Sequence, residues 1–213
     1  MSLLVVGSVA LDTIETPFGR VEDVLGGSAN YFAAAASFFS RVQVVGEDYP
    51  LERLGFLAER GVDLSEVERA PGESFRWAGA YSFDLNSRET LETHLGVFAA
   101  FKPKIPAGFG ASEWVFLGNI DPELQLDVLG QMRRPRFVAC DTMNFWIEGK
   151  RAALLELMQR IDLLLVNDSE ARELSGDYNL ARAARWIQRH GPRYVIVKKG
   201  EHGSPVVYAN SFT

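Results

Sequence analysis

The sequence predicts an α/β fold built on a doubly wound, mostly parallel sheet, and three observations support the prediction. Of the 213 residues, 47% are hydrophobic, which is enough to bury a full core. Short apolar runs rich in β-branched residues, typical of buried strands, occupy residues 3–9, 42–45, 114–117, 136–140, 163–166 and 194–197. Stretches with apolar residues at helical spacing occupy residues 51–60, 123–132, 150–160, 169–175 and 180–190. This alternation predicts helices on both faces of the sheet, an αβα sandwich.

The expected helix ends agree with this interpretation. Gly61 follows the first of the predicted helices, and Gly191 with Pro192 follows the last. Asp168 or Ser169 is placed to cap the helix over residues 169–175. The strand and helix boundaries are therefore supported by local sequence signals.

Two segments interrupt the alternation. Residues 12–18 follow the first strand without a helix, and residues 73–101 alternate polar and apolar positions around Trp77 and Tyr81. We expect a single domain over residues 1–213 with one inserted antiparallel sheet, a β lid formed by residues 12–20 and 73–101. Covering a cleft is the expected use of such a lid. A decorative hairpin or a dimer contact are the alternatives.

The composition argues against several classes of protein. The formal charge is −6 and the sequence pI is about 5.2, whereas surfaces that bind nucleic acid or anionic membranes are normally basic. Cys140 is the one cysteine and lies in an apolar run, which predicts a buried thiol in a reducing compartment. The apolar run at the N-terminus lacks a basic flank and is too short to span a bilayer. We therefore expect a soluble, cytoplasmic protein with no nucleic-acid or membrane partner.

One set of chemically informative residues lies near the start of the chain. Gly26 and Gly27 allow the backbone to approach a ligand closely, and the alanine-rich stretch after them is expected to open a helix with free N–H groups. Asp12 follows the first strand, where open parallel sheets place their ligand crevice, and a carboxylate there can accept hydrogen bonds from paired sugar hydroxyl groups. Asn30 adds an amide. A turn aspartate and a close-packed helix are the alternatives for the separate residues.

A second set lies nearer the end of the chain. Asn167 ends a strand and Glu170 follows three positions later, a spacing that can position a magnesium-bound water or a phosphate, although a capping box explains the spacing better on its own. Lys198 ends the last long strand and can attract a nucleotide phosphate. Gly200 and Gly203 would let the backbone run close to a base or ribose. A hairpin with solvated lysines is the alternative.

In this order and at this spacing, the segments resemble the ribokinase-like (PfkB-type) carbohydrate kinase family. The resemblance rests on residues 7–12, 26–30, the lid strands, 141–146, 167–170 and 198–203. It implies a doubly wound αβα sandwich with a small β lid. It also implies that the complete protein transfers a phosphoryl group from ATP, with Mg²⁺, to a hydroxyl group of a sugar or sugar-like acceptor.

The resemblance further implies roles for individual residues. Contact with the sugar is implied for Asp12, Gly26, Gly27 and Asn30. Asn167 and Glu170 match the family's Asn-x-x-Glu motif, so Glu170 is the expected metal contact. Lys198, Gly200 and Gly203 match the loop that borders the ATP site. Asn119 and Asp121, just past a strand end, could reach the acceptor. Lid residues that would select the acceptor are Arg76, Trp77, Tyr81, Asn86 and Arg88.

The sequence also departs from the family. The Gly-Ala-Gly-Asp signature, which supplies the family's general base and anion hole, does not occur in residues 1–213, as expected for the first two thirds of a C-terminally truncated family member. We therefore expect no catalytic residue in this chain and little phosphoryl transfer from it alone. Residues 41–48 also look shorter than in the family. Pairing of lids would give a homodimer.

Other functions are weighed against this one. A non-catalytic sugar- or nucleotide-binding protein of the same fold is the alternative from a different class. A dinucleotide dehydrogenase lacks support because no G-x-G-x-x-G follows the first strand, and Gly149-Lys150 lacks the rest of a P-loop. The three histidines show no metal-ligand spacing with Cys140.

Overall fold

The chain forms two compact units, Met1–Lys102 and Pro103–Thr213. The computed structural model describes residues 2–36, 40–41, 45–62, 64, 67, 69–85, 88–209 and 211–212. The expectation of a single domain over residues 1–213 stays a prediction.

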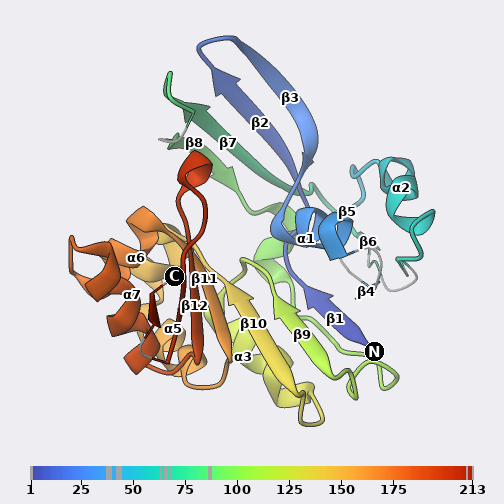
Figure 1. Ribbon diagram of the computed structural model, residues 1–213. Coiled ribbons are helices and arrows are strands. Elements are labelled where there is room, and N and C mark those ends of the chain that lie inside the picture. The colour runs from blue at the N-terminus through green and yellow to red at the C-terminus, as the bar shows by residue number, and fades with distance from the viewer. Residues whose placement is uncertain are drawn as a thin grey trace. The chain divides into compact units, whose positions relative to one another are not determined.

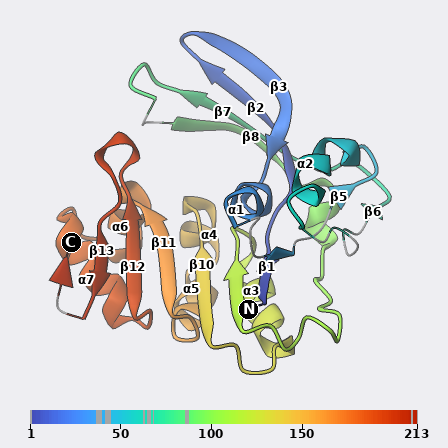
Figure 2. The ribbon, with the colours of Figure 1, turned by 45° about the vertical axis from the view of Figure 1, so that its right-hand side comes forward.

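The second unit is built on a sheet whose strand order is β14-β13-β12-β11-β10-β9 (Figure 2). Strands β9 to β12 run parallel, and β13 and β14 continue the sheet antiparallel. The bounds are β9 Trp114–Leu117, β10 Phe137–Asp141, β11 Leu163–Asn167, β12 Tyr194–Lys198, β13 Val206–Tyr208 and β14 Ser211–Phe212. The four predicted parallel strands are confirmed, three of them ending one residue later than expected, on a polar side chain.

The helices of this unit follow the strands in the expected alternation. They are α3 Pro122–Gln131, α4 Asn144–Gly149, α5 Arg151–Met158, α6 Asp168–Ser175 and α7 Leu180–Arg189, with a short 3₁₀ turn η3 at Gly200–His202. Every second residue of β10, β11 and β12 is buried, and helices α6 and α7 contact β11, β12 and β13. The mostly parallel α/β fold predicted from the sequence is confirmed.

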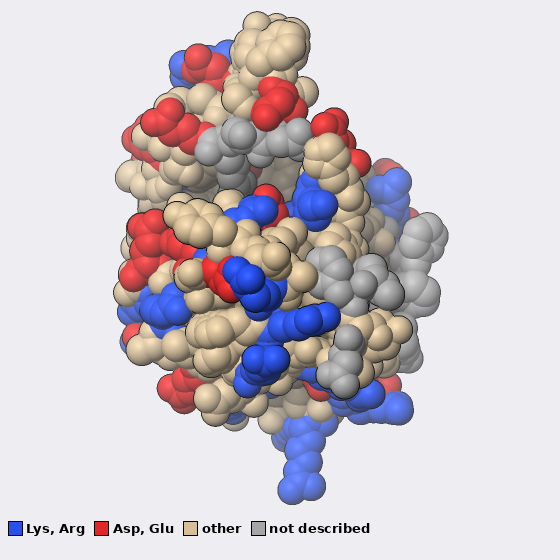
Figure 3. All heavy atoms as spheres, turned by 60° about the vertical axis from the view of Figure 1, so that its left-hand side comes forward, with Lys and Arg blue, Asp and Glu red and all other residues tan. Residues whose placement is uncertain are grey.

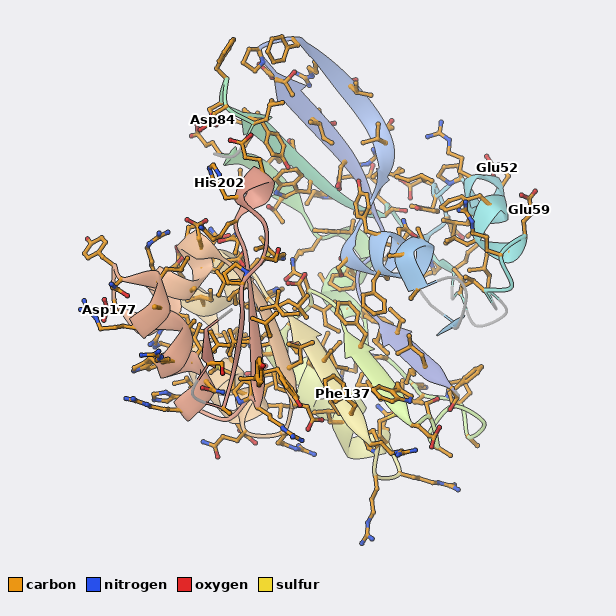
Figure 4. The ribbon with its side chains drawn as sticks, viewed as in Figure 1. Glu52, Glu59, Asp84, Phe137, Asp177 and His202 are labelled. Atoms are coloured by element: carbon orange, nitrogen blue, oxygen red, sulfur yellow. The ribbon has the colours of Figure 1, made fainter. Side chains whose placement is uncertain are left out.

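The other face of this sheet is only partly buried and bears a row of aromatic rings along the edge where the parallel strands begin and the antiparallel strand β13 ends. Ring centroids are 5.5 Å apart for Trp114 and Phe137, 6.1 Å for Phe137 and Tyr194, and 6.3 Å for Tyr194 and Tyr208. Figure 4 labels Phe137, the first residue of β10. These spacings are typical of favourable aromatic pairs.

The first unit begins with β1, Leu3–Val6, which pairs in parallel with β4, Ser40–Arg41. Helix α1, Ser28–Ala36, contacts both strands. The remaining short elements are β5 Val45–Gly46, η1 Leu51–Leu54, α2 Gly55–Ala58, β6 Arg69–Ala70 and η2 Gly96–Ala100. Residues 42–44, which belong to the strand predicted over 42–45 and to the segment 41–48 expected to be short, lie outside the described residues.

A separate four-stranded sheet, the lid sheet, has the order β3-β2-β7-β8 (Figure 1). Its strands are β2 Ala10–Thr16, β3 Gly19–Gly26, β7 Phe75–Tyr81 and β8 Arg88–His94. The predicted segment 12–20 is thus too short, because β3 continues to Gly26. The first five residues of β3 are exposed and mostly polar, so hydrophobic alternation could not reveal that strand.

The surface carries charges of both signs. On the face drawn in Figure 3, basic and acidic side chains lie among uncharged ones. Within the described part of the chain, no helix combines the length and the apolar character needed to cross a membrane.

Candidate substrate and nucleotide sites

Asp12 lies in β2 of the lid sheet, opposite Val24 of β3 and Trp77 of β7. Its carboxylate packs directly on the backbone of Gly26: a Cβ atom added there would lie 2.1 Å from the Asp12 Cγ and Oδ2 atoms. No residue with a side chain fits this contact without moving the carboxylate. Glycine at position 26 therefore leaves room for the Asp12 carboxylate, and contact of Asp12 or Gly26 with a sugar stays a prediction.

Gly27 makes an even closer backbone approach. Its φ angle is +90°, in the region that favours glycine. An added Cβ would lie 2.4 Å from the Ser8 carbonyl oxygen and 2.7 Å from the Val9 Cα atom. The Ala29 amide donates to that same Ser8 oxygen at 3.0 Å. Gly27 thus lets helix α1 start against the loop that follows β1.

Asn30 is 5% exposed and holds this loop from the inside. Its Nδ2 group donates to the Gly26 carbonyl oxygen at 2.7 Å and to the Tyr49 hydroxyl at 2.9 Å. Burial raises the pKa of Tyr49 to about 12, with a contribution from the Asp12 carboxylate, while the bond from Asn30 opposes the shift. The amide nitrogen of Asn30 is therefore engaged in fixing Gly26, and contact between Asn30 and a sugar stays a prediction.

Aromatic side chains surround Asp12, and two of them were not singled out from the sequence. Burial raises the pKa of Tyr31, and the charges of Asp12 and the Tyr81 hydroxyl raise it further, so the three groups lie within electrostatic reach. Tyr49 likewise senses Asp12. The signal for Tyr31 was its position next to Asn30 at the start of a helix. Nothing local pointed to Tyr49.

Arg76, expected to help select the acceptor, is engaged elsewhere. Its guanidinium group donates to Asp23 and, at 3.0 Å, to the Asp48 Oδ2 atom. Ser74 donates to the other Asp48 oxygen through its amide at 2.6 Å and its hydroxyl at 2.5 Å. Burial alone would raise the pKa of Asp48, but the bonds from Ser74 and Arg76 hold it below its usual value. This network holds β7 to the segment after β5.

A cavity of about 350 Å³ lies on the opposite face of the lid sheet from Asp12. Residues that pair across the strands point to the same face, and Leu11 pairs with Arg76, Thr13 with Ala78, and Ala78 with Glu92. All of these residues line the cavity, and so does Trp77, whereas Asp12 does not line it. Asn86 lies outside the described residues, and of Arg88 only the backbone is described.

The second predicted set lies in the second unit, where Asn167 and Glu170 form a capping box. The Asn167 side chain accepts from the Glu170 amide and Glu170 Oε2 accepts from the Asn167 amide, both at 2.7 Å. Asn167 is thus the N-cap of α6, and the expectation that Asp168 or Ser169 caps this helix is wrong. Glu170 is 4% exposed. The capping box, which the spacing alone favours, is therefore present. A metal contact of Glu170 stays a prediction.

Lys198 ends β12 and pairs with Asp141 at the end of β10, with 3.2 Å between Nζ and Oδ1. After it, Gly200 and Gly203 have φ angles of +56° and +81°. The Lys199 amide donates to the Gly203 carbonyl oxygen at 2.9 Å, which closes the turn. Both glycines are therefore required by the turn itself, and Lys198 is held at the carboxyl edge of the sheet.

Asn119 and Asp121 are occupied in structural contacts. Asn119 Oδ1 accepts from the Trp146 indole at 2.9 Å, and Nδ2 lies 3.0 Å from the Met143 sulfur. Asp121 caps α3 by accepting from the Glu123 amide at 2.8 Å. Contact of Asn119 or Asp121 with an acceptor stays a prediction.

The remaining expectations concern the cysteine and metal ligands. Cys140 is fully buried, and burial raises its pKa well above the usual value, with a further contribution from Asp141. This agrees with an unreactive thiol. Among the residues that the structure describes, no three His, Cys, Asp or Glu side chains are grouped so as to hold a metal ion.

Comparison with known proteins gives the following similarities. A cytidine kinase of Thermococcus kodakarensis is 28% identical over 218 residues, which cover all of this chain and 77% of the relative. An adenosine kinase of Sinorhizobium meliloti superposes with a TM-score of 0.77 at 19% identity, covering 100% of this chain and 78% of the other. A ribokinase of Cryptococcus neoformans in complex with ADP gives 0.77 at 17% identity, covering 98% and 76%. No family model matches the chain.

The mostly parallel α/β sheet with its helices is the fold that these kinases share. The relatives that match the chain over its whole length are kinases, which supports a phosphotransferase. The chain has a ribokinase-like fold.

Proposed function

We propose that the protein transfers the γ-phosphoryl group of ATP to a hydroxyl group of a sugar or sugar-like acceptor. The observation that carries the proposal is the packing of the Asp12 carboxylate on Gly26, 2.1 Å from the position of a Cβ atom. This contact places an acceptor of hydrogen bonds beside a close-packed Gly-Gly turn and the start of α1. The cytidine kinase to which the chain is similar gives independent support for the reaction class.

In the acceptor half of the site, the Asp12 carboxylate would accept hydrogen bonds from two adjacent hydroxyl groups. Bonds to a charged partner contribute about 1.5–3 kcal/mol each, so such a pair orients a ring firmly. Asn30 acts indirectly, because its Nδ2 group donates to the Gly26 carbonyl oxygen at 2.7 Å and so holds Gly26 in place. We propose that Gly26 and Gly27 contact the sugar through their backbone, because side chains there would fill the space that Asp12 and the Ser8 loop occupy.

In the nucleotide half, we propose that Lys198 contacts a phosphate of ATP and that the turn at Gly200 and Gly203 borders the nucleotide. Asp141 supports this role because its ion pair with Lys198 positions the ammonium group at the end of β12. Magnesium ions in such enzymes keep several waters and take one or two carboxylates together with phosphate oxygens. Glu170 is the proposed protein contact for Mg²⁺, which would neutralise charge on the phosphates.

The 213 residues contain no Gly-Ala-Gly-Asp sequence. On this proposal the chain by itself holds both substrates, while deprotonation of the acceptor hydroxyl requires a group that these residues do not supply. The second candidate function, a sugar- or nucleotide-binding protein without catalysis, is favoured by the same observation. The two candidate functions differ in whether the complete protein catalyses phosphoryl transfer.

Calorimetry and a phosphoryl-transfer assay test the proposal. The 213-residue chain is titrated with ribose, cytidine and ATP, and both this chain and the complete protein are assayed with radiolabelled ATP and each acceptor. Asp12→Asn should weaken acceptor binding and leave ATP binding unchanged, while Asp127→Asn, on the exposed side of α3, serves as the matched control. Binding of the acceptor with no transfer by the complete protein would favour the non-catalytic alternative.

We also propose that two copies pair through their lid sheets in the cytoplasm. Phe18 and Phe83, at the tips of the lid hairpins, are 72% and 76% exposed and lie 5.6 Å apart. An exposed pair of large aromatic rings is typical of an interaction surface. Sedimentation of the wild type and of Phe83→Ser should give a dimer and a monomer, and a monomeric wild type would rule out the pairing.

A further inference from the structure

One polar side chain is fully enclosed on the buried side of α3 in the second unit. Gln125 is 0% exposed, and the other buried residues of this helix are Pro122, Val128 and Leu129. Glutamine is rarely buried, because its amide group must find hydrogen-bond partners away from water. The amide nitrogen of Gln125 finds them at the carboxyl ends of two neighbouring strands, β9 and β10. Gln125 therefore connects a helix to the edge of the sheet at which Lys198 lies.

The Gln125 amide joins β9 to β10 at the point where their pairing ends. The last paired residues are Leu117 and Cys140. One residue further along each strand, Gln125 Nε2 donates to the carbonyl oxygen of Gly118 at 2.8 Å and to that of Asp141 at 3.2 Å. A longer bond of 3.4 Å reaches the Leu117 carbonyl oxygen. Because three carbonyl oxygens face this nitrogen, the orientation of the amide is unambiguous, and the side chain holds the two strand ends together.

Asp141, whose backbone is held in this way, carries the carboxylate that pairs with Lys198. Both side chains belong to the partly exposed face of the sheet, and Oδ1 of Asp141 lies 3.2 Å from Nζ of Lys198. Strand β11 lies between them, so the pair bridges two strand spacings, about 10 Å. The lysine side chain is a flexible stem with a point charge at its end, so its partner determines where the charge lies. A shift of the Asp141 backbone therefore moves the ammonium group.

We propose that Gln125 is a positioning residue for the nucleotide half of the site, because it fixes the Asp141 backbone and through it the Lys198 ammonium group. This inference rests on the proposed function and adds to it a residue that touches neither substrate. The bond that matters runs from Nε2 to the Asp141 carbonyl oxygen at 3.2 Å. The net contribution of one such bond corresponds to a factor of roughly 2 to 12 in an equilibrium constant. We expect ATP affinity to depend on Gln125 by a factor of this size.

The test measures ATP and acceptor binding by calorimetry on the 213-residue chain and its variants, with ribose and cytidine as acceptors. Gln125→Met removes the donor and keeps the length of the side chain, so ATP should bind roughly 2- to 12-fold more weakly while acceptor binding stays unchanged. In a Lys198→Met background the same substitution should have no further effect on ATP affinity, because the group that Gln125 positions is gone. This dependence on Lys198 identifies positioning.

Two further variants separate positioning from packing. Val128→Ala removes buried atoms from the same helix and should lower the melting temperature without changing ATP affinity. Gln125→Glu keeps the shape of the side chain, and burial raises the pKa of the new carboxyl group, whose protonated form donates to the Asp141 carbonyl oxygen. From about pH 5 to about pH 9, its ATP affinity should equal that of the parent at the acid end and fall below it as pH rises.

The outcomes distinguish this inference from the proposed function. Equal ATP affinity in the parent and in Gln125→Met overturns the inference and leaves the proposed function intact, as does an equally large loss with Lys198 present and absent. If Gln125→Met does not fold, the Gln125→Glu profile decides, and an ATP affinity that follows the parent at every pH overturns the inference. A parent chain that does not bind ATP overturns the inference together with the nucleotide half of the proposed function.

Discussion

Adding one methyl group at Gly26 should damage binding, whereas adding one at Gly27 should damage the fold. In Gly26→Ala the new Cβ meets the end of a side chain, 2.1 Å from the Asp12 Cγ and Oδ2 atoms. The carboxylate can rotate away while β2 stays in place. Because bonds to a charged group contribute about 1.5–3 kcal/mol, losing one aligned bond weakens acceptor binding roughly 10- to 150-fold.

In Gly27→Ala the new Cβ meets backbone instead, 2.4 Å from the Ser8 oxygen and 2.7 Å from the Val9 Cα atom. The left-handed backbone adds about 1–2 kcal/mol and the overlap about 1–3 kcal/mol. For a chain of this size the sum of about 2–5 kcal/mol lowers the melting temperature by roughly 4–20 °C. Calorimetry of acceptor binding and thermal unfolding followed by circular dichroism measure the two effects. Normal binding by Gly26→Ala, or normal melting of Gly27→Ala, would refute this account of the turn.

Three further predictions follow from single contacts. Asn30→Ala should lower the unfolding free energy by about 1–3 kcal/mol in urea titrations, because the Tyr49 hydroxyl and the Gly26 carbonyl lose their buried donor; Tyr49→Phe should cost less. Asp48 has a lowered pKa in the folded protein, so its contribution to stability is present above the ordinary value of 3.8 and is lost as pH falls through the lowered one. Urea unfolding from about pH 3 to pH 6 should show this loss in the parent and a flatter profile in Asp48→Asn, and identical profiles would contradict it. Lys198→Met should weaken ATP binding and leave acceptor binding unchanged in calorimetry, whereas equal ATP affinities would remove Lys198 from the nucleotide site.

The sequence was sufficient for the regular part of the fold. Strands such as β9 and β11 are short continuous apolar runs between amphipathic helices, a pattern that is recognisable without knowledge of their partners in the sheet. Strand β3 was missed in part because its exposed polar residues give no apolar alternation. Its pairing with β2 depends on partners across the sheet, which no local pattern records.

The candidate site likewise contains residues that the sequence pointed to correctly and residues whose contacts it did not predict. Asp12 and Gly26 were recognisable from local sequence, one as a carboxylate just past the first strand and the other as part of a Gly-Gly pair before an alanine-rich stretch, whereas their direct contact is seen only in the structure. The roles of Arg76 and Asn119 were not, since each side chain is held by residues distant in sequence: Arg76 by Asp23 and Asp48, and Asn119 by Trp146. The spacing of Asn167 and Glu170 is compatible with a helix cap and with a ligand contact, so the sequence alone does not decide between the two roles.

The second unit contains a row of aromatic rings whose near-ultraviolet signals report on its assembly. The row consists of Trp114, Phe137, Tyr194 and Tyr208. Neighbouring rings in the row come from positions 14 to 57 residues apart in the chain, by subtraction of their residue numbers. Coupled near-ultraviolet signals from these rings therefore require that β9, β10, β12 and β13 have reached their final alignment. Far-ultraviolet signals from helices such as α7 depend on local contacts and can arise earlier. The delay between the two signals during refolding therefore measures the time that the strands need to reach their native register.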